Sequence, residues 1–261
     1  MPETPLAVAS IAGLDSTHGR LAMSIGVFDG LHRGHAQLLA ELVREARDWG
    51  ARPAVLTFDA HPDRILKGEA PPLLLDPLDR LELLGAAGIG LVVVEHFDDR
   101  LRTTPYDVFV REIASRVDLA GFVMTPDAAF GFERRGTVEA VANLGNELGY
   151  QVAVISPLLL DGRPVSSSEV RRLVSTGDLA GAARLLGRPH AVVGTASTDG
   201  RLAFRLPVAL PPAGDYEVAL ESGPARLRVG PDGTARIVAG GPARPGRTRV
   251  LFGPEGPRFA G

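Results

Sequence analysis

Residues 26–35, which read GVFDGLHRGH, constrain the fold more than any other part of the chain. The mostly apolar run before them predicts a buried parallel strand at about 20–28. Apolar residues at helical spacing after them predict a helix at about 34–49. A turn from a strand into a helix directs free backbone N–H groups at one point, so this stretch predicts a phosphate-binding turn.

The side chains of this turn strengthen that interpretation. Gly26, Gly30 and Gly34 allow the backbone to approach a ligand closely. His32 and His35 are three residues apart and can face the same anion if the helix begins between them. A glycine-rich turn is often only a turn, and a single His-x-x-His is a weak signal. Their combination at a strand-to-helix turn favours a functional site.

Strands and helices alternate over the first 190 residues. The expected elements after the turn are strands at 53–58, 89–94, 121–124 and 152–155 and helices at 78–87, 106–117, 138–148, 167–175 and 178–186. Residues 1–18 show no clear periodicity, and Gly149 is expected to be the C-cap of the helix before it. Alternation of this kind predicts a Rossmann-like α/β fold, with a parallel sheet covered by helices on both faces.

The composition and the hydrophobic pattern of the sequence change after Pro189. Glycine and proline become dense, and short alternating runs predict strands at 201–206, 216–220, 225–229 and 248–252. Such strands are typical of a small antiparallel β domain. We therefore predict two domains, 1–188 and 189–261, which a chain of 261 residues is long enough to form.

Composition excludes several functional classes. The net charge of -3 gives no reason to expect nucleic acid or an anionic membrane as a partner. Cysteine is absent, which removes disulfides and thiol chemistry. The only lysine, Lys67, is not in a Gly-Lys-Ser/Thr context, so a P-loop is excluded. No metal-ligating cluster is expected. The sequence shows neither a signal peptide nor a run of about 18 apolar residues, so a cytoplasmic location is expected.

Residues 26–35 resemble the HxGH signature of the nucleotidylyltransferase superfamily, in the form found in bacterial FAD synthetases. Further segments resemble that family in the same order: 57–62 (TFDAHP), 75–84 (LDPLDRLELL), Phe130-Gly131 through Gly136, 165–171 (VSSSEVR) and 185–189 (LLGRP). The resemblance covers roughly residues 20–190. It implies an FMN adenylyltransferase that uses ATP and FMN, with Mg²⁺ bridging phosphates, and yields FAD and pyrophosphate.

The resemblance also implies residue roles. The expected catalytic residues are His32, His35 and Arg171. The expected nucleotide-binding residues are Gly26, Val27, Phe28, Asp29, Gly34, Ser167 and Ser168. The expected flavin-binding residues are Thr57, Phe58, His61, Pro62, Asp127 and Phe130. Considered alone, the serine run at 166–168 is more often a helix cap, although its hydroxyls and the nearby guanidinium offer several donors to a polyphosphate.

Two departures from the family pattern keep alternatives open. Ala128 and Ala129 replace an aromatic and a polar side chain near the expected flavin site, so flavin affinity is expected to be reduced or the acceptor to differ. The alternatives are a nucleotidylyltransferase for another small phosphate and a catalytically weak flavin or nucleotide sensor. Residues 193–208 lack the family's Gly-Arg-x-x-Gly-Phe-Pro-Thr-Ala-Asn stretch. The C-terminal domain therefore resembles a reduced riboflavin kinase barrel without kinase activity, with a structural role or a role in homo-oligomer formation.

Overall fold

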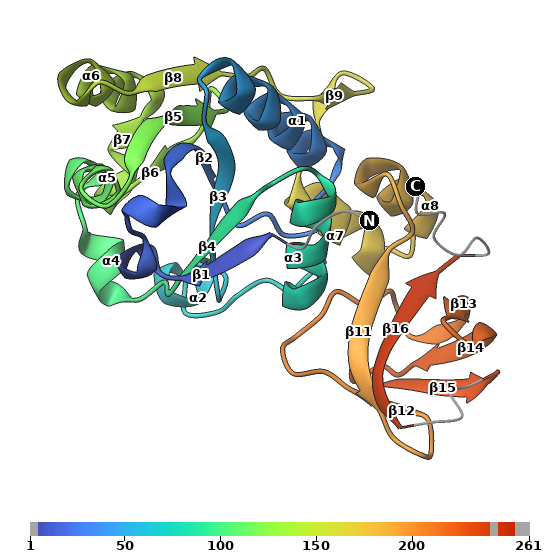
Figure 1. The fold of residues 1–261 in the computed structure, drawn as a ribbon. Coiled ribbons are helices and arrows are strands. Elements are labelled where there is room, and N and C mark those ends of the chain that lie inside the picture. The colour runs from blue at the N-terminus through green and yellow to red at the C-terminus, as the bar shows by residue number, and fades with distance from the viewer. Residues whose placement is uncertain (1–4, 241–244, 254–261) are drawn as a thin grey trace. The chain divides into compact units, whose positions relative to one another are not determined.

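A six-stranded parallel sheet organises the N-terminal part of the computed structural model, which describes residues 5–240 and 245–253 (Figure 1). The strand order is β1-β4-β3-β2-β5-β8, and every neighbouring pair is parallel. The strands are β1 (Leu6–Ala9), β2 (Arg20–Ile25), β3 (Arg52–Phe58), β4 (Leu91–Glu95), β5 (Asp118–Met124) and β8 (Gln151–Val154). All residues of β5 after Asp118 are buried, as expected for a central strand that is covered on both faces.

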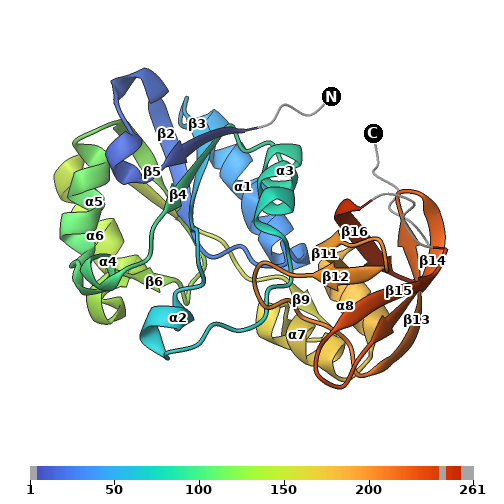
Figure 2. The ribbon, with the colours of Figure 1, turned by 90° about the horizontal axis from the view of Figure 1, so that it is seen from below.

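Helices cover both faces of this sheet, which confirms the predicted α/β fold. The helices are α1 (Arg33–Asp48), α2 (Asp63–Leu66), α3 (Pro77–Ala86), α4 (Asp99–Thr103), α5 (Tyr106–Ala114) and α6 (Val138–Leu148). Helices α5 and α6 lie on one face and α1 and α3 on the other (Figure 2). On the first face, Phe109 and Ile113 of α5 share a buried core with Phe122 of β5. Burial of such side chains is the main favourable term in folding.

Local signals fix the ends of several helices. Helix α6 has the predicted bounds, because the Thr137 hydroxyl accepts the Ala140 N–H at its start and Gly149 adopts a left-handed conformation at its end. Helix α7 (Ser167–Ser175) also has its predicted bounds, and α8 (Leu179–Leu186) begins one residue later than predicted. The helix predicted to reach 117 ends at 114, and the strand predicted to reach 28 ends at 25.

No strand or helix was predicted over residues 1–18, but the described part of this segment contains both. Strand β1 pairs with β4 from Leu6 opposite Leu91 to Ala9 opposite Val94, and the Leu6 N–H also donates to the Gly90 carbonyl at 3.1 Å. Two short 3-10 helices, Ile11–Gly13 and Ser16–His18, follow it. A four-residue edge strand carries too few residues to show a period in sequence. Residues 1–4 lie outside the described residues.

Six antiparallel strands close into a barrel near the C-terminus, in the order β11-β12-β15-β14-β13-β16. They are β11 (Ala191–Ala196), β12 (Arg201–Ala203), β13 (Gly214–Leu220), β14 (Gly223–Val229), β15 (Ala235–Ala239) and β16 (Gly246–Phe252). Alternate residues of β14 are buried and exposed, so Leu227 and Val229 fill the interior. The predicted antiparallel character is confirmed, although β11 and β15 were not predicted and β12 is shorter. Residues 241–244 and 254–261 lie outside the described residues.

Two pairs of short strands complete the regular structure. The short strands are β6 (Ala129–Phe130), β7 (Gly136–Thr137), β9 (Leu159–Leu160) and β10 (Arg163–Pro164), and Phe132–Arg134 is a 3-10 turn.

The two units into which contacts divide the chain are each made of several segments. The first unit comprises residues up to 28, 34–71 and 77–159, and the second comprises 29–33, 72–76 and 160 onwards. The predicted domain boundary near 188 stays a prediction. Within residues 5–240 and 245–253, every helix is too short or too polar to cross a membrane.

Candidate active site

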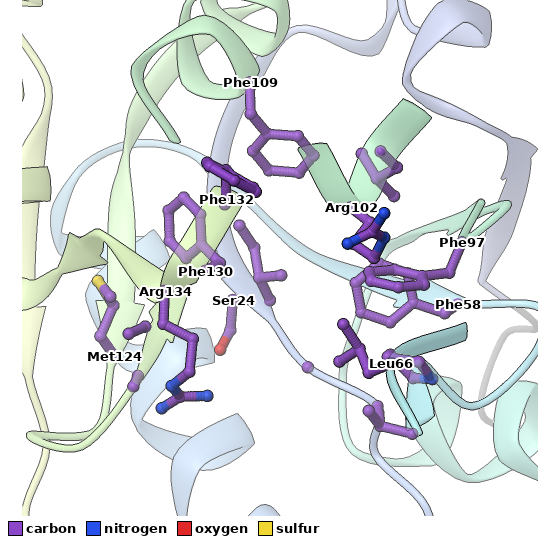
Figure 3. A pocket seen from close by; sticks show the side chains of 18 of the residues that line it. Ser24, Phe58, Leu66, Phe97, Arg102, Phe109, Met124, Phe130, Phe132 and Arg134 are labelled. Atoms are coloured by element: carbon purple, nitrogen blue, oxygen red, sulfur yellow. The ribbon is translucent and has the colours of Figure 1, made fainter. Parts of the chain in front are cut away.

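A pocket of about 690 Å³ lies in the first unit at the carboxyl ends of β2, β3 and β5 (Figure 3). Ser24 to Val27 line it after β2, Phe58 lines it at the end of β3, and Val123 to Thr125 line it at the end of β5. Ligands of open parallel sheets bind at this edge, and the volume is that of a pocket for a small molecule or cofactor. The pocket is therefore the strongest candidate for a substrate site among the described residues.

Aromatic rings form opposite walls of this pocket. Phe58 and Phe97 meet edge to face on one side, with ring centroids 5.4 Å apart. Phe130 and Phe132 lie on the other side, where the Phe130 ring is 5.7 Å from that of Phe109 in the core. The lining also includes the two basic residues Arg102 and Arg134. Rings with guanidinium groups nearby suit a planar aromatic ligand that carries negative charge.

Two glycines explain how one aromatic wall is held in place. Gly131 has φ 75°, and a Cβ atom there would lie 2.6 Å from the Tyr106 backbone. A Cβ atom on Gly136 would lie 2.6 Å from the Tyr106 Cβ. The Phe132 N–H donates to the Thr104 carbonyl at 2.8 Å. The Phe-Gly-x-x-x-x-Gly spacing therefore lets this loop pack directly on the start of α5 and present its phenylalanines to the pocket.

The pocket brings together most of the predicted flavin-binding residues and two of the predicted nucleotide-binding residues. The predicted residues in its lining are Gly26, Val27, Phe58, His61, Pro62, Asp127 and Phe130. Thr57 is different: it is fully buried, and its hydroxyl donates to the Val27 carbonyl at 3.1 Å. Arg80 donates to the same carbonyl at 3.0 Å and to that of Phe58 at 2.8 Å. Thr57 and Arg80 thus fix the backbone of the pocket rather than its surface.

Several residues of the lining were not predicted from the sequence. They are Phe97, Arg102, Phe132 and Arg134, together with Leu66 of α2. Phe132 and Arg134 fall inside the Phe-Gly-x-x-x-x-Gly segment, which was the one available signal. The others lie in loops or short helices, where neither periodicity nor a recognised motif marks a residue as part of a site.

Asp29, predicted to bind nucleotide, is committed to internal bonds in the second unit. It is 3% exposed, and its carboxylate accepts the N–H groups of Leu74 and Leu75 at 3.1 Å. The same carboxylate pairs with Arg171 at 2.6 Å. A buried carboxylate is tolerated only when it is paired and hydrogen-bonded, and here both conditions are met. Asp29 therefore anchors residues 72–75 and α7 to the turn.

The serine-rich segment contributes both a helix cap and a contact with the turn. The Ser166 hydroxyl accepts the Glu169 N–H at 3.2 Å, so this residue is the N-cap of α7. The Ser167 hydroxyl donates to the Asp29 carbonyl at 2.8 Å. Arg171 also donates through Nε to the Pro72 carbonyl at 2.8 Å. Ser168 lies exposed in the first turn of α7. Phosphate binding by Ser167, Ser168 and Arg171 stays a prediction.

The backbone of the glycine-rich turn adopts conformations that most side chains avoid. Phe28 has φ 51°, Gly30 has φ 81° and Leu31 has φ 39°. A Cβ atom on Gly30 would lie 3.0 Å from the Leu74 side chain, so both the conformation and the space favour glycine. Arg188 donates to the Gly30 carbonyl at 2.6 Å and to the Leu31 carbonyl at 3.0 Å. The strained turn is therefore tied by side-chain hydrogen bonds.

The two histidines of the signature have different surroundings. His32 is 5% exposed, and its burial, with a smaller contribution from the Arg188 charge, lowers its pKa to about 4. His32 is therefore neutral near pH 7 and offers one N–H rather than a full charge. His35 is half-buried in the first turn of α1, with its ring 5.2 Å from the ring of Phe28. Across the described residues there is no group of three or more His, Asp or Glu able to hold a metal ion.

A doubly wound parallel sheet with a ligand-sized pocket at its carboxyl edge defines a Rossmann-like α/β protein, here joined to a closed β-barrel. The chain belongs to the FAD synthetase family, which matches residues 14–169. A solved structure described as a macrolide-efflux protein from Streptococcus pneumoniae is 20% identical and has a TM-score of 0.79, covering 96% of this chain and 90% of that one. At that identity the likeness concerns the fold alone.

Relatives described as bifunctional riboflavin kinase/FMN adenylyltransferases are similar to this chain. The protein from Pseudomonas fluorescens is 30% identical over 200 residues, 76% of this chain and 64% of the relative. The one from Haemophilus influenzae is 29% identical over 175 residues, 66% of this chain and 57% of the relative. A putative one from Geobacillus thermodenitrificans is 28% identical over 168 residues, 64% of this chain and 89% of the relative. The match to the first two thus spans less than two thirds of their length.

Proposed function

We propose that this protein is an FMN adenylyltransferase, which makes FAD and pyrophosphate from FMN and ATP. A phosphate oxygen of FMN forms a bond to the α-phosphorus of ATP. The bond between that phosphorus and the oxygen bridging to the β-phosphorus breaks, and pyrophosphate leaves with the electron pair. One observation carries the proposal: a single pocket of about 690 Å³ is lined by five of the six residues expected to hold the flavin and by Gly26 and Val27 of the signature.

The proposed roles follow from what each group can offer. Such a transfer needs no protein nucleophile, because positioning and stabilisation of phosphate charge supply the catalysis. His32 and His35 donate to the phosphate oxygens, and Ser167, Ser168 and Arg171 hold the leaving phosphates. Binding of the leaving phosphates would require Arg171 to exchange bonds it now makes within the protein. We expect Mg²⁺ to bind the phosphate oxygens and to keep several waters, which asks few ligands of the protein.

The flavin ring would occupy the space between the two aromatic walls. Phe58 and Phe130 supply apolar ring contacts from opposite sides (Figure 3). His61 and Asp127 add polar groups to the lining of the same pocket. Ala128 and Ala129 also line the pocket. The smaller side chains leave room there, and Phe132 and Phe97 offer aromatic contact area that was not expected from the sequence. This arrangement supports an FMN-sized acceptor in spite of the two alanines.

We further propose that the chain does not phosphorylate riboflavin. Where the family resemblance would place a glycine-rich phosphate loop, strands β11 and β12 join through a tight turn. The Ser197 N–H donates to the Arg201 carbonyl at 2.9 Å, and the Gly200 N–H donates to the Ser197 carbonyl at 3.0 Å. These N–H groups are engaged within the turn, so they do not form a nest for a polyphosphate. In this proposal 1–188 is the adenylyltransferase domain and 189–261 a remnant of a kinase barrel.

An assay of the purified full chain tests both parts of the proposal. With FMN, ATP and Mg²⁺ we expect FAD and pyrophosphate in equal amounts, measured by chromatography and a pyrophosphate assay. With riboflavin in place of FMN we expect no FMN. Adenylylation of another small phosphate without FAD formation would contradict the choice of FMN. Tight ligand binding without turnover would indicate a sensor, and steady FMN formation would contradict the missing kinase activity.

A further inference from the structure

We propose that Arg188 is a positioning residue for the nucleotidyl transfer, because its guanidinium holds the turn that carries His32. The inference rests on the proposed function, since it assigns a part in that same reaction to a residue outside the predicted site. Arg188 belongs to the LLGRP segment, which carried a resemblance but no assigned role. All of the contacts that support the inference lie within the second unit.

Side chains from 167–188 hold three consecutive carbonyls of the turn. The Asp29 carbonyl accepts the Ser167 hydroxyl at 2.8 Å. The Gly30 and Leu31 carbonyls both accept from Arg188, through Nη2 at 2.6 Å and Nη1 at 3.0 Å. A carbonyl oxygen carries partial negative charge and would repel a phosphate. The Arg188 guanidinium offsets this negative charge at the Gly30 and Leu31 carbonyls, beside His32, which is expected to contact the phosphate.

Strain in the turn gives these hydrogen bonds a specific task. Leu31 has φ 39°, which is rare for a residue with a side chain, and it directly precedes His32. Such a conformation persists only where the surroundings determine it several times over. The planar guanidinium can satisfy two adjacent carbonyls at once in a fixed geometry, whereas a lysine ammonium is a flexible point donor. Arg188 therefore restrains the backbone that sets the position of His32.

The base of Arg188 is itself fixed by the end of α8. Gly187 ends this helix in a left-handed conformation with φ 75°, and its N–H donates to the Ala183 carbonyl at 2.8 Å. Pro189 follows and limits the backbone on the other side. The Nη1 atom also contacts the Leu186 carbonyl at 3.3 Å. Because the backbone next to Arg188 is already restrained, less conformational entropy is lost when the guanidinium binds the turn.

The same guanidinium affects the protonation of His32. Its positive charge disfavours imidazolium and adds to the larger effect of burial in lowering the His32 pKa. Removal of the charge alone should raise this pKa part of the way toward its ordinary value. The pKa of His32, measured by NMR, therefore reports on the Arg188 contact and does not require turnover. The His32→Gln variant lacks the His32 signal and so identifies it among those of the six histidines.

Three variants of the full chain test the inference. We expect Arg188→Met to lower kcat by about a hundredfold while the KM values for ATP and FMN change by less than about threefold, since a small misplacement of a catalytic group costs that much. We expect Arg188→Lys to lower kcat by about tenfold and to leave the His32 pKa lowered. In Arg188→Met the His32 pKa should rise. Arg184→Met is the matched control, because Arg184 lies in α8 and is exposed, and it should behave like the native protein.

Several outcomes would overturn the inference. A native kcat in folded Arg188→Lys, or in folded Arg188→Met, would show that the turn needs no fork of hydrogen bonds. An unchanged His32 titration in Arg188→Met would show that the contact is not made in solution. If Arg188→Met does not fold, the kcat of Arg188→Lys decides. If the native protein makes no FAD at all, the proposed function fails, and the His32 titration still tests the contact separately.

Discussion

The pocket of the first unit and the turn 29–33 of the second are built from different kinds of side chain. The turn commits its groups to internal bonds, with the Asp29 carboxylate, the Ser167 hydroxyl and the Arg188 guanidinium all engaged within the unit. The pocket is walled by rings such as Phe58 and Phe132. A hydrogen-bonded turn can hold a reacting group in position, whereas an apolar pocket selects a ligand by shape and area. The contrast separates residues expected to govern stability and turnover from those expected to govern affinity.

The largest effect is expected where the turn depends on a buried charge. Asp29→Ala leaves Arg171 without its carboxylate and two N–H groups without an acceptor, so we expect a loss of about 3–5 kcal/mol in the free energy of unfolding. Urea denaturation followed by circular dichroism measures it. Asp118→Ala removes an exposed pair with Arg20 and serves as the control, with a loss below about 1 kcal/mol. Equal losses in the two variants would contradict the structural role of Asp29.

Acid should weaken the turn in a way that depends on His32. Its pKa is lowered from 6.5 to about 4 by burial and by Arg188, so the unfolded chain binds a proton more readily than the folded one. Its contribution is complete above pH 6.5 and is lost as the pH falls toward 4, by on the order of 3 kcal/mol. The free energy of unfolding, measured by urea denaturation between pH 4 and 7.5, should fall more steeply for the native protein than for His32→Gln. Parallel curves would place His32 in solvent.

Turnover should depend on both histidines of the signature, although they lie in different surroundings. We expect His32→Ala or His35→Ala to lower kcat by about a hundredfold or more, the usual loss for one preorganised donor to a transition state. Steady-state FAD formation measures it, and circular dichroism confirms that each variant is folded. His18→Ala is a suitable control, since this residue ends the 3-10 helix Ser16–His18 and accepts the Asp15 N–H there. Near-normal turnover in either signature variant would make that histidine structural.

The smallest effect is expected at the rim of the pocket. Phe132 is 36% exposed, so Phe132→Ala should change the free energy of unfolding little but remove one aromatic contact from the ligand. We expect the KM for FMN to rise about fivefold to tenfold, with kcat nearly unchanged. Val238→Ala in β15 removes a side chain that is 38% exposed in the barrel and is the matched control. An unchanged KM in Phe132→Ala would exclude this ring from the flavin contact.

Local sequence signals predicted the elements that have their own start and stop residues. Helix α6 was placed correctly because Gly149 marks its end, and α7 because hydroxyl residues mark its start. The central strands were found because burial on both faces leaves continuous apolar runs. Strands β1 and β11 were missed, and the strands that place them, β4 and β16, lie far away in sequence. Strand β15 was also missed, although it pairs with the preceding strand β14.

The candidate site was only partly predictable for the same reason. The signature and the TFDAHP segment identified five pocket residues through their resemblance to a family, but no local pattern marks Phe97 or Arg102. The ion pair between Asp29 and Arg171 joins residues 142 apart in sequence. A single sequence contains no signal for such a contact, because it depends on which segments the fold brings together. Arg188 was overlooked as a functional candidate on the same grounds.

The contacts of the turn also set an order of events during synthesis. Arg188 and Ser167 reach carbonyl groups 158 and 138 residues earlier in the chain. At about 5–20 residues per second, a ribosome needs roughly 10 to 30 s after making Gly30 before it adds Arg188. Closing so long a loop also costs entropy that only the finished contacts repay. A nascent chain can therefore contain the strands that line the pocket while the turn 29–33 is still unrestrained. Only after Arg188 has been made can the turn be held in its final conformation, so shorter nascent chains lack the arrangement that we propose for catalysis.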